Sequence, residues 1–308
     1  MHTAIAICTY QRPTGLNRLL DSVAKLTLPD GVSDSDVAVV VVDNHEDGEG
    51  LAVCEGRAPD YRFALRAICK PGNGISEARN ASVEMALSVQ PTYVGFLDDD
   101  EWPENIWLKE LVSVLEKANA DVVGGPTRSV FPDDAPVELL DNPYFGADMN
   151  LADGTSCELQ AAGNFLIRAD VLAKTVPDSF HPDFAHSGGE DLAFFTQLAQ
   201  QGAQMVWAAQ AVVHEEVPNN RLSNDWLRTR VIGIANSRVR VMQMMEPEWY
   251  QSLIRGAKTA ALAAQASVFS VAGLASPELA SQAEQLRWKF IGKFTAHFNR
   301  KTTRPEGH

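Results

Sequence analysis

The first 125 residues alternate between short apolar runs and stretches in which apolar residues recur every three or four positions. The runs predict buried strands at residues 4–8, 37–43, 63–68, 92–97 and 120–125. Between them, spacings such as Leu16, Leu19 and Leu20 predict amphipathic helices. Repeated strand–helix units favour the α/β class with a mostly parallel sheet, which binds ligands at the carboxyl ends of its strands.

The middle of the chain has a different pattern. Residues 126–160 are rich in Pro, Asp and Asn and have little periodicity, so we expect a long surface loop or an irregular insert there. Residues 163–168 resume a strand, and residues 188–202 read as a Gly-Gly turn followed by a helix. Two apolar runs, 204–209 and 211–217, predict short strands.

The last part of the chain is helical in pattern. From about Ser223 onward we expect helical segments, with Pro247 and Pro277 as breaks between them. The predicted organisation is therefore one α/β domain over residues 1–222 and a C-terminal helical extension over residues 223–308.

Composition and charge exclude several classes of protein. Net charge is −14, so a general nucleic-acid binder is not expected, because phosphate contacts need clustered Lys and Arg. Residues 250–308 carry +5, which leaves −19 for the rest. Four cysteines without CxxC spacing fit a reducing cytosol and argue against structural zinc. No signal-peptide pattern and no uncharged apolar run of about 20 residues is present, so we expect a cytoplasmic, soluble or peripheral protein.

Three polar clusters follow directly on predicted strands. CTYQRP, with Thr9, Tyr10 and Arg12, follows the first strand; VDN, with Asp43, follows the second; and LDDDEWP, residues 97–103, follows the fourth. Because the carboxyl ends of parallel strands meet at one edge of the sheet, these side chains should line one cleft.

The four acids Asp98, Asp99, Asp100 and Glu101 admit two interpretations. They could be a solvated turn that caps the following helix, since acids are favourable at helix N-termini. Four in a row exceed what capping needs, and adjacent carboxylates repel one another unless they are neutralised. A hard divalent cation, held by one or two carboxylates together with substrate phosphates, would explain them. Asp43 could terminate its strand or accept hydrogen bonds from a nucleobase or ribose.

Two further positions carry candidate chemistry. Glu190 and Asp191 follow two glycines and could be a helix N-cap, or could present a carboxylate base that takes a proton from an incoming hydroxyl. His214 could be a buried core histidine, a third metal ligand or a surface residue.

These residues lie in segments that resemble a known family. AIAICTYQRPTGLNRLLDSV, VVVVDN, GISEARNASVEMA, YVGFLDDDEWPENIWLKEL, GNFLIR and GGEDLAFFTQLAQQGAQMVWAAQAVVHEEVP occur in the order and spacing of family 2 of the inverting nucleotide-sugar glycosyltransferases. The GGED and VVHEEVP segments look most like the succinoglycan-type bacterial polysaccharide transferases. The resemblance covers residues 1–230.

The resemblance implies a GT-A fold, Rossmann-like, that binds a nucleoside-diphosphate sugar, with UDP favoured, and Mn²⁺ or Mg²⁺. It also implies a role for each matching residue. Asp191, in the family's ED position beside Glu190, would be the general base. The remaining matches would contact the nucleotide or the metal: Thr9, Tyr10, Arg12, Asp43 and Arg79 at the nucleotide, Asp98 near the ribose and metal, Asp100 on the metal, and His214 as a further metal ligand. The extra acid Asp99 leaves the register of the ligands open by one residue.

The implied acceptor is a glycan or polyprenyl-linked saccharide in bacterial exopolysaccharide or cell-surface polysaccharide synthesis. Rival functions are a non-catalytic sugar-nucleotide-binding protein and a sugar-1-phosphate nucleotidyltransferase. The latter should have a Gly-rich phosphate loop after the first strand, and CTYQRP contains no Gly.

The stretch RWKFIGKFTAHFNRKTTR, residues 287–304, contains six basic residues and no acid, interleaved with aromatic residues. Phe290, Ile291, Phe294 and Phe298 fall on one stripe of a helix. This stretch could be a terminal helix that packs on the acidic body. It could instead rest peripherally on the anionic cytoplasmic face of the inner membrane.

Overall fold

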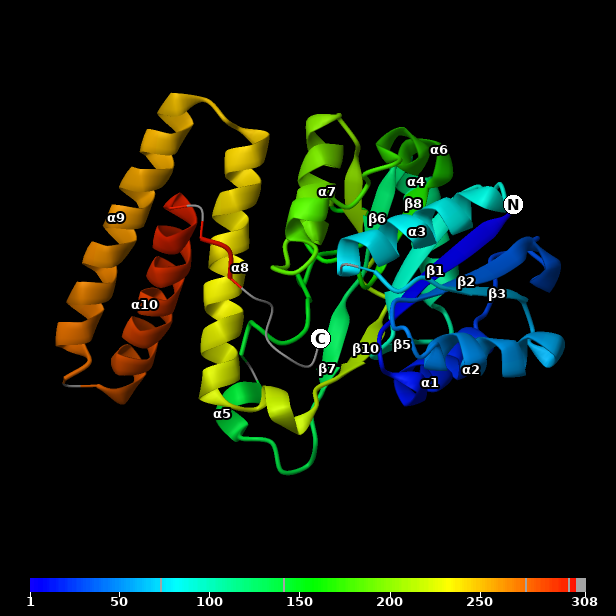
Figure 1. The fold of residues 1–308 in the computed structure, drawn as a ribbon, viewed down its shortest axis with the longest axis horizontal. Helices are drawn as coiled ribbons and strands as arrows, with labels where there is room; N and C mark the ends of the chain where they lie inside the picture. The colour runs from blue at the N-terminus through cyan, green and yellow to red at the C-terminus, as the bar shows by residue number, and fades with distance from the viewer. Residues whose placement is uncertain (73, 141, 275, 299, 303–308) are drawn as a thin grey trace.

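The computed structural model describes residues 1–302 except 73, 141, 275 and 299, and its fold is shown in Figure 1. Seven strands of the described chain form the larger sheet. In spatial order they are β3 (Ala64–Cys69), β2 (Val37–Asp43), β1 (Thr3–Thr9), β4 (Tyr93–Asp98), β8 (Phe165–Arg168), β6 (Val122–Gly124) and β9 (Met205–Trp207). Each strand predicted in the first 125 residues is present within two residues of its expected ends.

The sheet is mostly parallel, as predicted. β3, β2, β1 and β4 are parallel neighbours, and so are β6 and β9. β8 is the exception, since it runs antiparallel to both β4 and β6. The mixed half of the sheet is therefore built around a strand whose direction the apolar pattern of 163–168 did not reveal.

Helices cover both faces of the sheet, because alternate side chains of each strand point to opposite faces. The covering helices are α1 (Pro13–Val23), α2 (Glu49–Arg57), α3 (Ile75–Ser88), α4 (Trp107–Ala118), α6 (Ala169–Leu172) and α7 (Glu190–Gln200). Ile5 and Ile7 of β1 belong to a core that includes Leu19 of α1 and Leu111 of α4. Ala4 and Ala6 belong to a second core on the other face, with α3 and α7.

A second, three-stranded sheet stands beside the carboxyl edge of the first. Its order is β5 (Glu101–Pro103), β10 (Val213–Glu216), β7 (Thr127–Val130). The loop expected over residues 126–160 is therefore wrong at its start, where β7 pairs with β10, and it also contains the short helix α5 (Val137–Leu140). Single 3₁₀ turns lie at Asp34–Asp36 (η1), Ala58–Asp60 (η2), Ala173–Thr175 (η3), Pro182–Phe184 (η4) and Asn219–Arg221 (η5).

Three long helices complete the described chain: α8 (Asn224–Met245), α9 (Trp249–Ala272) and α10 (Pro277–His297). They lie side by side, with α8 next to α7 and α10 packed on both α8 and α9 (Figure 1). Pro277 is the first residue of α10 and Pro247 lies between α8 and α9, so the predicted breaks are confirmed. Among the described residues, none of the helices has the length and apolar character needed to cross a membrane. The division into domains 1–222 and 223–308 stays a prediction.

Candidate active site

Three strands of the larger sheet end in polar residues at the same edge. Thr9 on β1 is in register with Asp43 on β2, and Cys8 of β1 is in register with Asp98 of β4. A cavity of about 610 Å³ opens there. Its lining includes most of the residues singled out in the sequence, namely Thr9, Tyr10, Arg12, Arg79, Asp98, Asp99, Asp100, Glu190 and Asp191.

Asp99 is turned into the fold. Its Oδ2 accepts hydrogen bonds from Thr9 Oγ1 at 2.8 Å and from the Tyr10 backbone N–H at 3.1 Å, and its Oδ1 accepts one from Arg12 Nη1 at 3.0 Å. Burial raises the pKa of Asp99 to about 6, although Arg12 opposes the shift. The middle acid therefore ties the end of β4 to the end of β1.

Glu101 is buried behind the cluster. Its carboxylate accepts a hydrogen bond from the backbone N–H of Asp98 at 2.9 Å, and its pKa is well above the ordinary value because of burial and the neighbouring Asp98. A Cβ at Gly163 would lie 2.4 Å from a Glu101 carboxylate oxygen, so a larger residue there would have to displace that carboxylate. Glu101 lines the cavity and fixes the turn of the cluster through this hydrogen bond.

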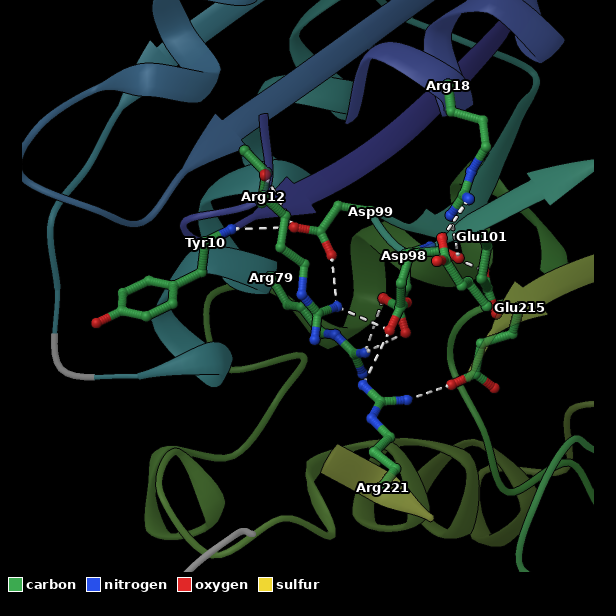
Figure 2. A network of polar contacts seen from close by, with 12 residues as sticks. Tyr10, Arg12, Arg18, Arg79, Asp98, Asp99, Glu101, Glu215 and Arg221 are labelled. Atoms are coloured by element: carbon green, nitrogen blue, oxygen red, sulfur yellow. Dashed lines mark hydrogen bonds and ion pairs between the residues drawn. The ribbon is translucent and has the colours of Figure 1, made fainter. Parts of the chain in front are cut away.

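Asp100 accepts hydrogen bonds from two arginines on one oxygen. Its Oδ2 lies 2.7 Å from Arg12 Nη1 and 3.1 Å from Arg221 Nη2. Burial acts against its ionisation, but the two guanidinium groups outweigh that effect and hold the pKa of Asp100 below the ordinary value. Arg221 also donates from Nη1 to Glu215 at 2.7 Å and is almost fully buried. Figure 2 shows the arginines converging on the acids.

Asp98 faces the cavity with about a third of its side chain exposed. It accepts hydrogen bonds from Arg79 Nη2 at 3.1 and 3.4 Å. Arg79 is buried on α3, and its Nη1 lies 3.5 Å from Glu190 Oε1 at the start of α7. Arg79 therefore links the acid cluster to the second acidic pair.

Glu190 and Asp191 begin α7 after Gly188 and Gly189, whose positive φ angles make the tight turn. Glu190 is almost fully buried against Arg79. Asp191 is partly exposed, lines the cavity, and accepts a hydrogen bond from the Leu192 backbone N–H at 2.8 Å. Of the two acids, Asp191 is the one that an incoming molecule can reach.

Two of the predicted site residues lie outside the cavity lining in the described chain. The carboxylate of Asp43 accepts hydrogen bonds from the backbone N–H groups of His45, Gly50 and Leu51, so it anchors the start of α2. The Nε2 atom of His214, on β10, lies 3.1 Å from Oε1 of Glu104.

The predicted metal ligands are not all brought together. Across residues 1–302 with the four gaps named above, no group of three or more His, Cys, Asp or Glu side chains could hold a metal ion. Asp98 and Asp100 both border the cavity, whereas His214 stacks on Trp102 away from it. The geometry therefore gives no support to His214 as a ligand.

The cavity has a second wall that the sequence analysis did not identify. α8 contributes several residues from the helical extension, and the 144–147 and 160–163 segments contribute others. The lining residues on α8 are Trp226, Arg230, Gly233, Ile234 and Ser237. The helical pattern of 223–245 indicated a helix but not which face of it would meet the strand-end acids.

The mostly parallel sheet, the acid cluster at its carboxyl edge and the glycine-presented carboxylate across the cavity agree with the GT-A class of glycosyltransferases that the sequence resembles. The model of glycosyl transferase family 2 matches residues 4–176, and the chain belongs to that family. It is 31% identical over 235 residues to the succinoglycan biosynthesis protein ExoM of Rhizobium meliloti strain 1021. The matched region covers 75% of this chain and 72% of that protein.

Solved structures share the fold at low sequence identity. A mannosyltransferase from Pyrobaculum calidifontis, in complex with GDP-Man and Mn²⁺, matches 97% of this chain and 88% of its own with a TM-score of 0.61 and 15% identity. TarS residues 1–349 from S. aureus, in complex with UDP, match 97% of this chain and 92% of that chain with a TM-score of 0.54 and 15% identity. The chain is therefore a glycosyltransferase with the GT-A fold.

Proposed function

We propose that this glycosyltransferase moves a sugar, with inversion, from a nucleoside-diphosphate sugar to a hydroxyl of a glycan or lipid-linked glycan. UDP is the expected nucleotide. The observation that carries the proposal is the cavity itself, which has Asp98 and Asp100 on one side and Asp191 on another. Similarity to a succinoglycan biosynthesis protein supports a role in bacterial exopolysaccharide or cell-surface polysaccharide synthesis.

Asp98 and Asp100 are the residues that would hold a divalent cation, Mn²⁺ or Mg²⁺. The donor set fits, because both carboxylates border the cavity and Mg²⁺ is usually bound through one or two carboxylates together with substrate phosphates. Asp99 and Glu101 are occupied by hydrogen bonds within the fold. When bound, such a cation stabilises negative charge on the departing diphosphate.

Asp191 is the proposed general base. It would accept the proton of the acceptor hydroxyl while that oxygen forms a bond to the anomeric carbon of the donor sugar. The bond between the anomeric carbon and the diphosphate oxygen breaks at the same time, and the diphosphate leaves with the electron pair. Attack from the side opposite the leaving group inverts the anomeric centre.

Arginines and polar residues at the strand ends would orient the donor. We propose that Thr9, Tyr10, Arg12 and Arg79 border the nucleotide, since all four line the cavity. The aromatic ring of Tyr10 is about half exposed there, which suits contact with a base or ribose. Asp43 would contribute by fixing the turn at the end of β2.

A panel of nucleotide sugars tests the proposal. Thermal shifts with and without Mn²⁺ identify the donor, because a ligand that binds the folded state raises the melting temperature with concentration. Transfer and donor-hydrolysis assays with a chelator control then measure turnover. Binding of a nucleotide sugar without any transfer or hydrolysis would contradict the enzyme and favour the non-catalytic sugar-nucleotide-binding protein.

We also propose that the acceptor is membrane-linked and that the protein contacts the cytoplasmic face of the membrane peripherally. Ile291, Phe294 and Phe298 of the predicted stripe are exposed, and the rings of Phe294 and Phe298 are 5.0 Å apart. Trp288 of the same helix is buried in a cluster with Trp226. Of the predicted stretch 287–304, residues 299, 303 and 304 lie outside the described chain.

A further inference from the structure

Arg221 occupies an unusual position for a cation. Its side chain is only 2% exposed, yet it reaches two carboxylates: Asp100 from Nη2 at 3.1 Å and Glu215 from Nη1 at 2.7 Å. It belongs to η5, the turn that joins β10 to α8, and so comes from the opposite wall of the cavity (Figure 2). A buried charge of this kind is stable only while its partners stay in place.

Asp100 is consequently surrounded by positive charge in the ligand-free protein. Arg12 and Arg221 both donate to its Oδ2, and Arg12 also donates to Asp99. A divalent cation that approached Asp100 alone would meet two guanidinium groups at hydrogen-bonding distance from the same oxygen. Like charges held this close repel strongly in a partly buried site.

A diphosphate removes that conflict. Like a carboxylate, its phosphate oxygens accept hydrogen bonds from guanidinium groups, often two at a time. When it enters the cavity, the arginines gain a new acceptor and Asp100 becomes available to a cation. The anion and the cation therefore each improve the binding of the other.

We propose that Arg221 is a positioning residue that closes Asp100 to free divalent cations until a nucleoside diphosphate is bound. The inference rests on the proposed function, because it takes Asp100 as a cation ligand and the donor as a nucleoside-diphosphate sugar. The cation and the nucleotide then enter as a coupled pair, and the coupling is reciprocal. Chelation of the cation by phosphate also couples the two ligands, so the test must isolate the part that depends on Arg221.

Mn²⁺ titrations of the full chain, followed by the EPR signal of free Mn²⁺, measure this directly. In the wild type we expect Mn²⁺ to bind at least about tenfold more tightly with saturating UDP than without it. In Arg221→Met we expect the affinity for Mn²⁺ without nucleotide to be about tenfold higher than in the wild type. The increase in Mn²⁺ affinity that UDP causes should be smaller than in the wild type. Arg62→Met is the charge-matched control, because Arg62 pairs with Asp34, which precedes β2 at the opposite end of that strand from the cavity.

Each outcome decides the matter. If Arg221→Met binds Mn²⁺ alone no better than Arg62→Met does, the inference is wrong. Should Arg221→Met fail to fold, Arg221→Lys replaces it. The single ammonium group of lysine lacks the planar fork with which Arg221 bridges two carboxylates. We therefore expect Arg221→Lys to bind Mn²⁺ alone more tightly than Arg62→Met does, by a smaller factor than Arg221→Met would. Equal Mn²⁺ affinities of Arg221→Lys and Arg62→Met would overturn the inference. If neither UDP nor GDP binds to the wild type, with or without Mn²⁺, the proposed function is wrong instead.

Discussion

Asp99 differs from the acids on either side of it in what its carboxylate does. All three aspartates accept a hydrogen bond from an arginine, but Asp99 also accepts hydrogen bonds from Thr9 and from the backbone of Tyr10. These extra bonds within the fold are the reason that we favour Asp98 and Asp100, rather than Asp99, as the pair facing a ligand. Their roles toward a cation stay predictions.

Stability should depend on pH through Asp99. Its pKa is raised to about 6, so the folded state holds this proton more tightly than the unfolded chain does. Its contribution is present below the ordinary pKa near 4 and is lost as the pH rises through about 6. Urea unfolding at pH 4.5 and at pH 7 measures this effect. Between these pH values the free energy of unfolding should fall by about 2 kcal/mol more in the wild type than in Asp99→Asn. The same loss in both proteins would contradict the assignment.

Asp100→Ala should abolish Mn²⁺-dependent binding of UDP, because it removes a proposed cation ligand. The variant should fold with reduced stability, because the buried Arg221 loses one of its two carboxylate partners and keeps Glu215. Calorimetric titration with UDP and Mn²⁺, alongside circular dichroism, measures both effects. An unchanged affinity, with the loss found in Asp98→Ala alone, would restrict the ligand role to Asp98.

Asp191→Asn should bind donor nearly normally but turn over about 10²–10⁴-fold more slowly, because only deprotonation of the acceptor is lost. Initial rates at saturating donor give the measurement. Glu190→Gln is the matched comparison, because Glu190 is buried against Arg79 and should affect stability and donor binding more than proton transfer. An active Asp191→Asn beside an inactive Glu190→Gln would assign the base to Glu190.

At the scale of elements, α10 approaches α8 closely enough to require a glycine. A Cβ at Gly292 would lie 2.3 Å from the backbone oxygen of Ile232. Gly292→Ala should therefore push the helices apart and lower the free energy of unfolding by about 1–3 kcal/mol.

Gly256 of α9 provides the control for that substitution. A Cβ there meets nothing within 4 Å, so Gly256→Ala should be neutral or raise stability by up to about 1 kcal/mol through helix propensity. Thermal unfolding of the two variants tests the pair. Equal melting temperatures would mean that α8 and α10 are not packed as described.

Elements could be predicted from the sequence where burial dictates the pattern, and less well where partners decide it. The run VAVVVVD is β2 with the expected ends because both of its faces are covered. The strand over 165–168 was predicted, but not its antiparallel direction, since apolar side chains do not encode direction. β7 was missed because its four residues pair with a strand more than 80 residues away.

For the whole molecule, the exposed apolar stripe of α10 makes membrane attachment testable. Truncation would remove the buried Trp288, so the better variant is Phe294→Ser with Phe298→Ser, both exposed in the described chain. We expect the wild type to sediment with vesicles that contain anionic lipid, less so in high salt, and the double variant to sediment weakly. Val137→Ser, at an exposed position on α5, is the control. Equal sedimentation of all three would refute attachment through this stripe.

Part of the candidate site, the acids at the strand ends, could be predicted from the sequence, and part of it could not. Parallel topology brings the ends of β1, β2 and β4 together, so the strand-end acids could be assigned to one cleft from sequence. Arg221 could not, because it meets Asp100 across 121 residues and through the orientation of a turn before α8. Asp43 lies at the same edge of the sheet but outside the cavity lining, because its carboxylate accepts hydrogen bonds from the backbone at the start of α2.

The wall that α8 gives to the cavity has a consequence for engineering. A chimera joined between residues 222 and 223 would retain the acids at the strand ends and would take its Trp226, Arg230 and Ser237 positions from the other parent. Such an exchange would leave the donor chemistry with one parent and hand part of the substrate enclosure to the other. The helical extension is thus the segment to exchange when the shape of the cavity is to change while the strand-end acids stay as they are.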